Sequence, residues 1–187
     1  MGAPDGKIDE ADMVLQGDFN PKLIFGFGST FKYKGFDLSL FFNGQYKYWI
    51  YNEQYLFYTT NTEFLYGGWN RSKDFLNVWT PDNTTGTIPA MPKYKHNNVG
   101  WNTLAFQKIS FLRLKNITLG YNFPNKILGT SIRIYADATN LLTFTNLKGG
   151  DPETFTYHAQ TQYGNTGSGL NAYPNQKSYT MGVSVDF

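Results

Sequence analysis

The stretch that decides the fold reads FDLSLFFNGQYKY and runs from Phe36 to Tyr48. Apolar and aromatic side chains occupy nearly every even-numbered position, whereas Asp37, Ser39 and Asn43 occupy odd-numbered ones. Successive side chains of a β-strand point to opposite faces of a sheet, so this alternation predicts a strand with one apolar face and one polar face.

Four other stretches show the same two-residue period. In the stretch that contains Leu114 and Ile117 the apolar parity changes part-way, and a β-bulge near Lys115-Asn116 would restore a single apolar face. The sequence therefore predicts an all-β fold of antiparallel amphipathic strands. We expect these strands at about 22–34, 35–48, 109–123, 131–141 and 177–187.

The connections between the predicted strands alternate between short and long. Lys34-Gly35 alone separates the first two strands, whereas the segments 49–108 and 142–176 are far longer than ordinary loops. Short turns at one end and long loops at the other are typical of transmembrane β-barrels, whose strands turn apolar side chains to lipid and polar ones to the lumen. A soluble antiparallel sandwich with one wet face shows the same alternation, so periodicity leaves both architectures open.

The composition of the chain argues against several classes of binding partner and structure. The 187 residues carry a net charge of only +2, which gives no support to binding of nucleic acid or an anionic membrane surface. The chain has no cysteine, which excludes a disulfide scaffold. Aromatic residues make up 18% of the chain and charged residues 16%, against about 25% charged in ordinary soluble domains. No apolar run approaches the roughly 20 residues of a membrane-spanning helix.

Hydrogen bonding limits how such a sheet can exist in lipid. Open sheet edges would expose unpaired backbone groups where no water satisfies them, and small barrels need about eight strands. Five predicted strands cannot close alone. We expect that further strands precede Met1, that several copies associate, or that the membrane interpretation fails.

The segment before the first strand resembles the second half of a calcium-binding loop. Gly6 would permit the sharp turn, and Asp5, Asp9 and Asp12 are the candidate metal ligands. Met1 and Ala3 occupy positions where such loops carry oxygen ligands, so an exposed acidic turn is the competing interpretation. Calcium is the one cofactor that the sequence suggests.

A series of short motifs runs along nearly the whole chain: DGKID at 5–9, GDFNPK at 17–22, YKGFDLS at 33–39, VWTPDN at 78–83, IPA at 88–90, SFLRLKNITLGY at 110–121, NL at 140–141, TF at 143–144, GDPE at 150–153 and the closing strand that ends at Phe187. In their order and spacing, these motifs resemble the C-terminal part of SusC/RagA-type TonB-linked (TonB-dependent) outer-membrane proteins.

The resemblance implies that the five strands are the last five of a large transmembrane barrel of about 22 strands, with 49–108 and 142–176 as extracellular loops. It implies a Bacteroidetes-type nutrient importer in the outer membrane, driven by TonB and capped by a SusD-like surface lipoprotein, which takes up oligosaccharides or peptides. Phe187 is similar to the terminal aromatic signal that the barrel assembly machinery recognises. No plug domain, TonB-binding segment or signal peptide occurs in these residues.

Catalytic chemistry finds little support in the sequence. His96 and His158 lie on expected loops, and no nucleophile turn, His-Glu-x-x-His motif or phosphate-binding glycine loop is present. Asp82, Asp151 and Glu153 are the carboxylates that a glycosidase would need, but nothing in the sequence fixes their separation. We expect no enzyme and no catalytic residue.

Ligand contact is more plausible for the loop tryptophans. Trp69, Trp79 and Trp101 offer flat faces to sugar rings beside hydrogen-bonding side chains. The competing interpretation is that each tryptophan packs within its own long loop. The alternative function is a secreted, soluble β-sandwich that binds glycans through these tryptophans. We also expect short helices at 52–58 and 72–78, the second capped by Ser72.

Overall fold

The computed structural model describes residues 13–60, 70–90, 103–124, 129–154 and 173–186. Five strands form one antiparallel sheet in the order β1-β2-β3-β4-β5, so each strand pairs with its neighbours in sequence. The predicted fold of antiparallel amphipathic strands is confirmed. The elements are β1 (Leu23–Tyr33), β2 (Phe36–Tyr51), the helix α1 (Glu53–Thr60), the 3-10 helix η2 (Lys73–Asn77), β3 (Phe106–Asn122), β4 (Ser131–Thr145) and β5 (Ser178–Asp186).

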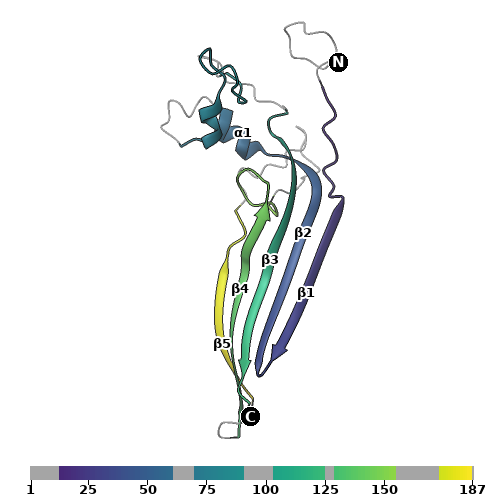
Figure 1. Ribbon diagram of the computed structural model, residues 1–187, viewed down its shortest axis with the longest axis vertical. Coiled ribbons are helices and arrows are strands. Elements are labelled where there is room, and N and C mark those ends of the chain that lie inside the picture. Colours follow the sequence, from purple (N-terminus) through teal and green to yellow (C-terminus); the bar gives the residue numbers. More distant parts are fainter. Residues whose placement is uncertain (1–12, 61–69, 91–102, 125–128, 155–172, 187) are drawn as a thin grey trace.

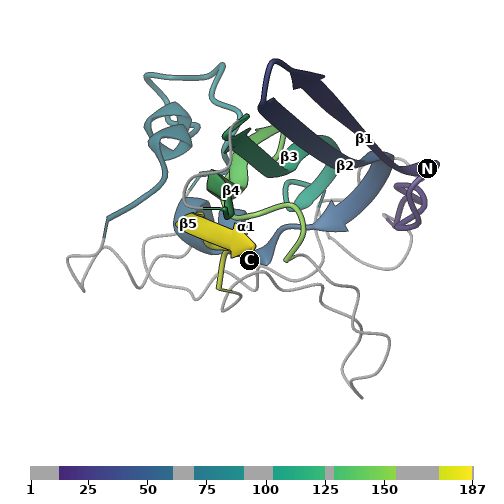
Figure 2. The same cartoon turned by 90° about the horizontal axis from the view of Figure 1, so that it is seen from below.

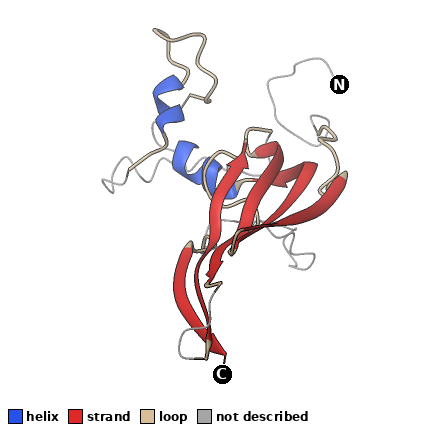
Figure 3. Cartoon of the chain, turned by 60° about the horizontal axis from the view of Figure 1, so that its bottom comes forward, coloured by secondary structure: helices blue, strands red, loops and turns tan. Residues whose placement is uncertain are grey.

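The strands form a single curved layer, with α1 beyond one end of it (Figures 1 and 3). The β1–β2 turn and the end of the chain lie at the opposite end, so the short connections and the long ones are separated in space (Figure 1). Seen from below, the five strands follow an arc (Figure 2). No helix among the described residues is long and apolar enough to cross a membrane.

One face of the sheet is apolar and exposed. The register aligns the apolar parities of all strands, and the rings of Phe27 and Phe42 stack with their centroids 5.0 Å apart across β1 and β2. No second layer of the described chain covers this face, which is contrary to the sandwich alternative. Its exposed members include Phe27, Phe31, Leu119, Ile134, Leu142, Phe144, Met181 and Val183.

The opposite face carries paired polar groups. Arg133 of β4 donates from Nη2 to Asp37 Oδ2 of β2 at 2.6 Å, and this ion pair crosses β3 above Gly120. A Cβ at position 120 would clash with both partners, so the pair requires glycine there. Farther along the face, Asp137 accepts from Thr118 Oγ1 at 2.6 Å. These charges fit a water-facing surface, because unpaired charges in an apolar medium are costly.

A bulge in β3 keeps the apolar face continuous. The register with β2 shifts between Phe41 and Phe42, which lie opposite Asn116 and Leu114, so Lys115 is the extra residue. The predicted bulge near Lys115-Asn116 is confirmed. It places Leu114 on the same face as Phe42, although its parity differs from that of Leu119.

A second bulge in β2 was not predicted. Lys47 has a φ of 51°, and the register with β3 shifts between Gln45 and Tyr48. Residues after Lys47 therefore change face. Tyr48 is even-numbered, so the alternation in the sequence predicts that it lies on the apolar face. This prediction is wrong, because Tyr48 is 5% exposed and packs on the polar side with Ile109.

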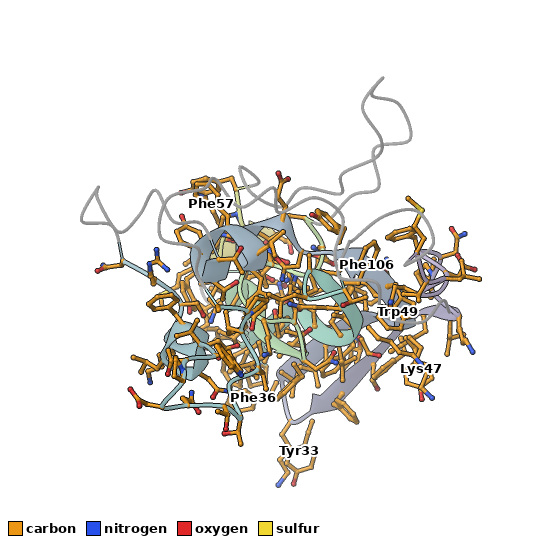
Figure 4. All side chains as sticks on the ribbon, turned by 90° about the horizontal axis from the view of Figure 1, so that it is seen from above. Tyr33, Phe36, Lys47, Trp49, Phe57 and Phe106 are labelled. Carbon is orange, nitrogen blue, oxygen red and sulfur yellow. The ribbon has the colours of Figure 1, made fainter. Side chains whose placement is uncertain are left out.

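The core of the described chain lies at the loop end of the sheet. Tyr48, Ile50, Ile109 and Phe111 form one buried cluster, against which Leu147 packs. Trp49 follows Tyr48 in β2, and its indole lies against Gly17. The Trp49 backbone N–H donates to Asp18 O at 3.0 Å. Seen from above, Trp49 and Lys47 lie together at one side of the molecule (Figure 4).

A charge added to the apolar face should affect stability in the membrane far more than a charge added to the polar face. Leu40→Arg on the apolar face should destabilise the inserted protein by about 2–4 kcal/mol near the membrane midplane. Thr180→Arg is the matched control, because Thr180 is exposed opposite Asp137 on the polar face. Folding into lipid vesicles, followed by protease protection, measures the difference. Equal losses for the two variants would contradict the assignment of the faces.

Candidate functional site

The polar face holds a buried cluster of charges where the chain after β4 folds back over β3. Arg113 of β3 is 2% exposed. Its Nη2 donates to Asp151 Oδ1 at 2.5 Å, and its Nη1 donates to Glu153 Oε2 at 2.8 Å. One guanidinium therefore holds two carboxylates of the loop, and we call Arg113, Asp151 and Glu153 the loop clamp.

Neighbouring residues connect the loop clamp to β2, to a second residue of β3 and to the segment just before β5. Asn43 Nδ2 of β2 donates to Glu153 Oε1 at 2.6 Å, and Lys115 Nζ of β3 donates to Glu153 Oε2 at 3.0 Å. Asn175, just before β5, donates from its backbone N–H to Asp151 Oδ2 at 2.9 Å. The same two carboxylates thus fix both ends of the connection between β4 and β5.

The ionised form of Asp151 is favoured. Burial alone would raise its pKa, but the hydrogen bonds from Arg113 and from the backbone N–H groups of Glu153 and Asn175 outweigh burial and hold the pKa below its usual value of 3.8. The Tyr48 hydroxyl donates to Pro152 O at 3.3 Å beside them. The clamp is therefore a charged, hydrogen-bonded anchor at neutral pH.

A second polar cluster joins the two long loops. Lys148 Nζ donates to Asp74 Oδ2 at 2.8 Å and to the Tyr55 hydroxyl at 3.2 Å, and that hydroxyl donates to Asp74 Oδ2 at 2.5 Å. The hydrogen bonds from Lys148 and Tyr55 lower the pKa of Asp74, and the bond to Asp74 raises that of Lys148. We call Tyr55, Asp74 and Lys148 the loop triad.

Local capping positions the loop triad. Asn52 is fully buried and accepts at Oδ1 from the backbone N–H of Tyr55 at 2.9 Å, as an N-cap of α1 does. Its Nδ2 donates to Lys148 O at 2.9 Å. Ser72 caps η2 by accepting from the Asp74 backbone N–H at 3.3 Å, so the predicted cap is confirmed.

Of the three tryptophans predicted to contact a ligand, the structure describes Trp79. Its side chain is 42% exposed, while Ile88 of the same loop is 2% exposed and lies across the Val78–Ile88 bridge. Ile88 rather than Trp79 thus supplies the buried residue of this loop. Trp69 and Trp101 lie outside the described residues. Ligand contact by these tryptophans stays a prediction.

Other predicted site residues also fall outside the described part of the chain. These are the calcium candidates Asp5, Asp9 and Asp12, the terminal Phe187, and His96 and His158. Among the described residues, no three His, Cys, Asp or Glu side chains gather in a way that could hold a metal ion. Calcium binding and the role of Phe187 stay predictions.

The carboxylates considered for glycoside cleavage have another role. Asp151 and Glu153 do lie together, but Arg113 bonds to both of them. Asp82 lies instead in the turn bridged by Thr80 and Asn83. Carboxylates paired to a buried arginine form a structural anchor. Arg113 and the loop triad were missed by sequence reasoning, although Arg113 lies in a motif that sequence analysis had identified.

Comparison with known proteins places this arrangement in a family. The chain is 34% identical, over 98% of its length, to TonB-dependent receptor P3 of Formosa agariphila, and 26% identical over 98% to TonB-dependent receptor SusC of Bacteroides thetaiotaomicron. The solved structure of the RagAB peptide transporter matches 92% of the chain with a TM-score of 0.71 and 30% identity.

Over nearly its whole length, this chain matches one segment of the SusC/RagA-type TonB-dependent receptors. The predicted resemblance is confirmed, and with it the outer-membrane location and the transmembrane β-barrel to which the strands belong. The chain spans 18% of the length of receptor P3 and 17% of that of SusC. No family model matches it. The total of about 22 strands stays a prediction.

Removing the loop clamp should destabilise this receptor segment. Arg113→Met leaves Asp151 buried without its cation and Glu153 with Lys115 alone, and breaking such a buried pair costs about 3–5 kcal/mol. Lys22→Met is the control, because Lys22 is exposed before β1 and its described hydrogen bonds come from the backbone. Urea unfolding of the complete receptor in detergent measures the change. A loss no larger than that of the control would refute the anchoring role.

Acidification should weaken the same anchor. Because the folded-state pKa of Asp151 lies below 3.8, its stabilisation is complete above that pH and is lost as the pH falls through the folded-state value. The gap in unfolding midpoint between the wild type and Asp151→Asn should therefore be wide at neutral pH and narrow in strong acid. A gap that is independent of pH would show that the charge of Asp151 contributes nothing.

Proposed function

We propose that this chain forms part of the wall and two extracellular loops of an outer-membrane nutrient importer. The main support is a single sheet that has an exposed apolar face on one side and ion-paired polar side chains on the other. The chain also matches TonB-dependent receptors over 98% of its length. Lipid would meet the apolar face and water the polar one. The open edges of β1 and β5 would pair with other strands of the receptor.

The cargo that we propose is an oligosaccharide or a peptide, moved by a TonB-driven cycle without catalysis. The relatives are named as receptors, and one solved neighbour is titled a peptide importer, which supports uptake rather than chemistry. We further propose a SusD-like surface lipoprotein as partner, because the RagAB neighbours bear two-component names. Trp79, with Trp69 and Trp101, would contribute to ligand contact, and Phe187 to recognition by the barrel assembly machinery.

Uptake by the complete receptor tests this function. Cells that lack the receptor should fail to accumulate a mixture of fluorescent oligosaccharides and peptides, and the wild-type gene should restore uptake. The Thr180→Arg variant should restore it as well, whereas Leu40→Arg should not, since it blocks insertion. Co-purification on the tagged receptor reports the lipoprotein partner. Unchanged uptake of every probe without the receptor would contradict the proposed function.

A further inference from the structure

The apolar face carries a groove over β4, near the end of the sheet where the short connections lie. Its volume is about 570 Å³, which falls within the range of about 300–1,000 Å³ that small-ligand sites occupy. Residues of β3, β4 and β5 line it, together with Phe36 at the start of β2. None of the described residues that line it carries a charge. We call it the β4 groove.

The register of the sheet explains why the groove lies over β4. Ala136 of β4 lies opposite Leu119 of β3 on one side and opposite Met181 of β5 on the other. In the next row toward the short connections, Ile134 lies opposite Tyr121. Side chains that lie opposite each other on neighbouring strands are in contact, so the small Ala136 leaves a low point between larger neighbours.

One end of the β4 groove suits the boundary between membrane and water. Phe36 follows the Lys34-Gly35 turn directly, and Tyr121 is the last residue but one of β3, at the same end of the sheet (Figure 1). The ring centroids of Phe36 and Tyr121 are 4.5 Å apart, and those of Tyr121 and Phe123 are 5.1 Å apart, so rings on both sides hold the Tyr121 ring. Tyrosine favours such boundaries because its ring is apolar and its hydroxyl forms hydrogen bonds.

The surroundings of this face limit what can occupy the groove. The face lies in the outer membrane, where lipid chains are as apolar as the groove, so burial alone gives no preference and van der Waals contacts decide. A linear hydrocarbon chain over Ala136 touches the strand below it and also Leu119 and Met181 at its sides. Elsewhere on the face it would touch only the ends of projecting side chains, and each lost atom contact weakens the attraction.

We infer that the β4 groove holds one acyl chain of a phospholipid, whose ester and phosphate groups lie near the Tyr121 hydroxyl. The inference rests on the proposed function, which puts the long loops outside the cell and the short connections in the periplasmic leaflet. Phospholipid forms that leaflet, whereas lipid A lies in the opposite one. The wall of the importer thus has a defined lipid site in addition to general contact with the membrane.

Photo-crosslinking of the complete receptor in lipid nanodiscs tests the site. The probe is a phosphatidylethanolamine that carries a diazirine in the middle of one acyl chain, and mass spectrometry locates the labelled residues after illumination. Labels should concentrate on β3, β4 and β5 around Ala136. Unlabelled phosphatidylethanolamine should compete with the probe more strongly than the same fraction of lipid A.

Matched variants show whether the groove causes this labelling. Ala136→Leu fills the groove and should lower the labelling about fivefold, since roughly ten atom contacts with the chain are lost. Ala136→Gly keeps the groove open and should retain the labelling. Ser29→Leu is the control, because Ser29 is exposed opposite Leu40 on the same apolar face but does not line the groove.

Each outcome decides for or against the site. Labelling that is concentrated around Ala136, lowered by Ala136→Leu and unchanged by Ser29→Leu supports it. Uniform labelling of the apolar face, equal effects of the two leucine variants, or stronger competition by lipid A overturns it. Protease protection checks that each variant inserts, and the distribution of labels on the wild type decides even where a variant does not. Normal uptake of the mixed oligosaccharide and peptide probes together with uniform labelling would refute this site alone.

Discussion

The structure depends on one constraint, which is that a single layer of hydrogen-bonded strands separates two solvents. Outside the bulges, the backbone groups between the edges pair along the register of neighbouring strands, so mainly side chains meet the surroundings. Phe27, Leu119 and Met181 face one side without cover, and the Asp37–Arg133 pair faces the other. The first face is stable only in apolar surroundings, and the second face is stable only in water. The sheet therefore suits the wall of a membrane protein.

The loop end meets a different requirement, because the long connections need internal anchors to hold a shape. Two electrostatic clusters supply them, of which the loop clamp is buried and the loop triad is partly exposed. The loop clamp ties both ends of the β4–β5 connection to β3, and the loop triad joins that connection to α1 and η2. Both clusters pair a cation with carboxylate oxygens and add further hydrogen bonds. In the loop clamp, this pairing is what allows the charges to be buried.

Features that depend on residues close together in the sequence could be predicted, and features that depend on residues far apart could not. The face of Leu114 and the bulge at Lys115 could be predicted, because alternation is a local property and a change of parity is visible along the chain. Tyr48 was assigned to the wrong face because Tyr46 and Tyr48 continue the apolar parity through the bulge at Lys47, and nothing local marks the change. The loop triad joins residues 93 positions apart, a distance at which the sequence carries no pairing signal.

Glycines on the polar face let long side chains lie close to the backbone of the sheet. The Asp37–Arg133 pair lies flat across Gly120, and the Tyr135 ring lies flat across Gly182, where a Cβ would clash with it. Long side chains that would otherwise project inward are thus folded down against the strands. The polar face therefore presents fixed charges and a phenol group close to the backbone, and more open space remains in front of the sheet than projecting side chains would leave.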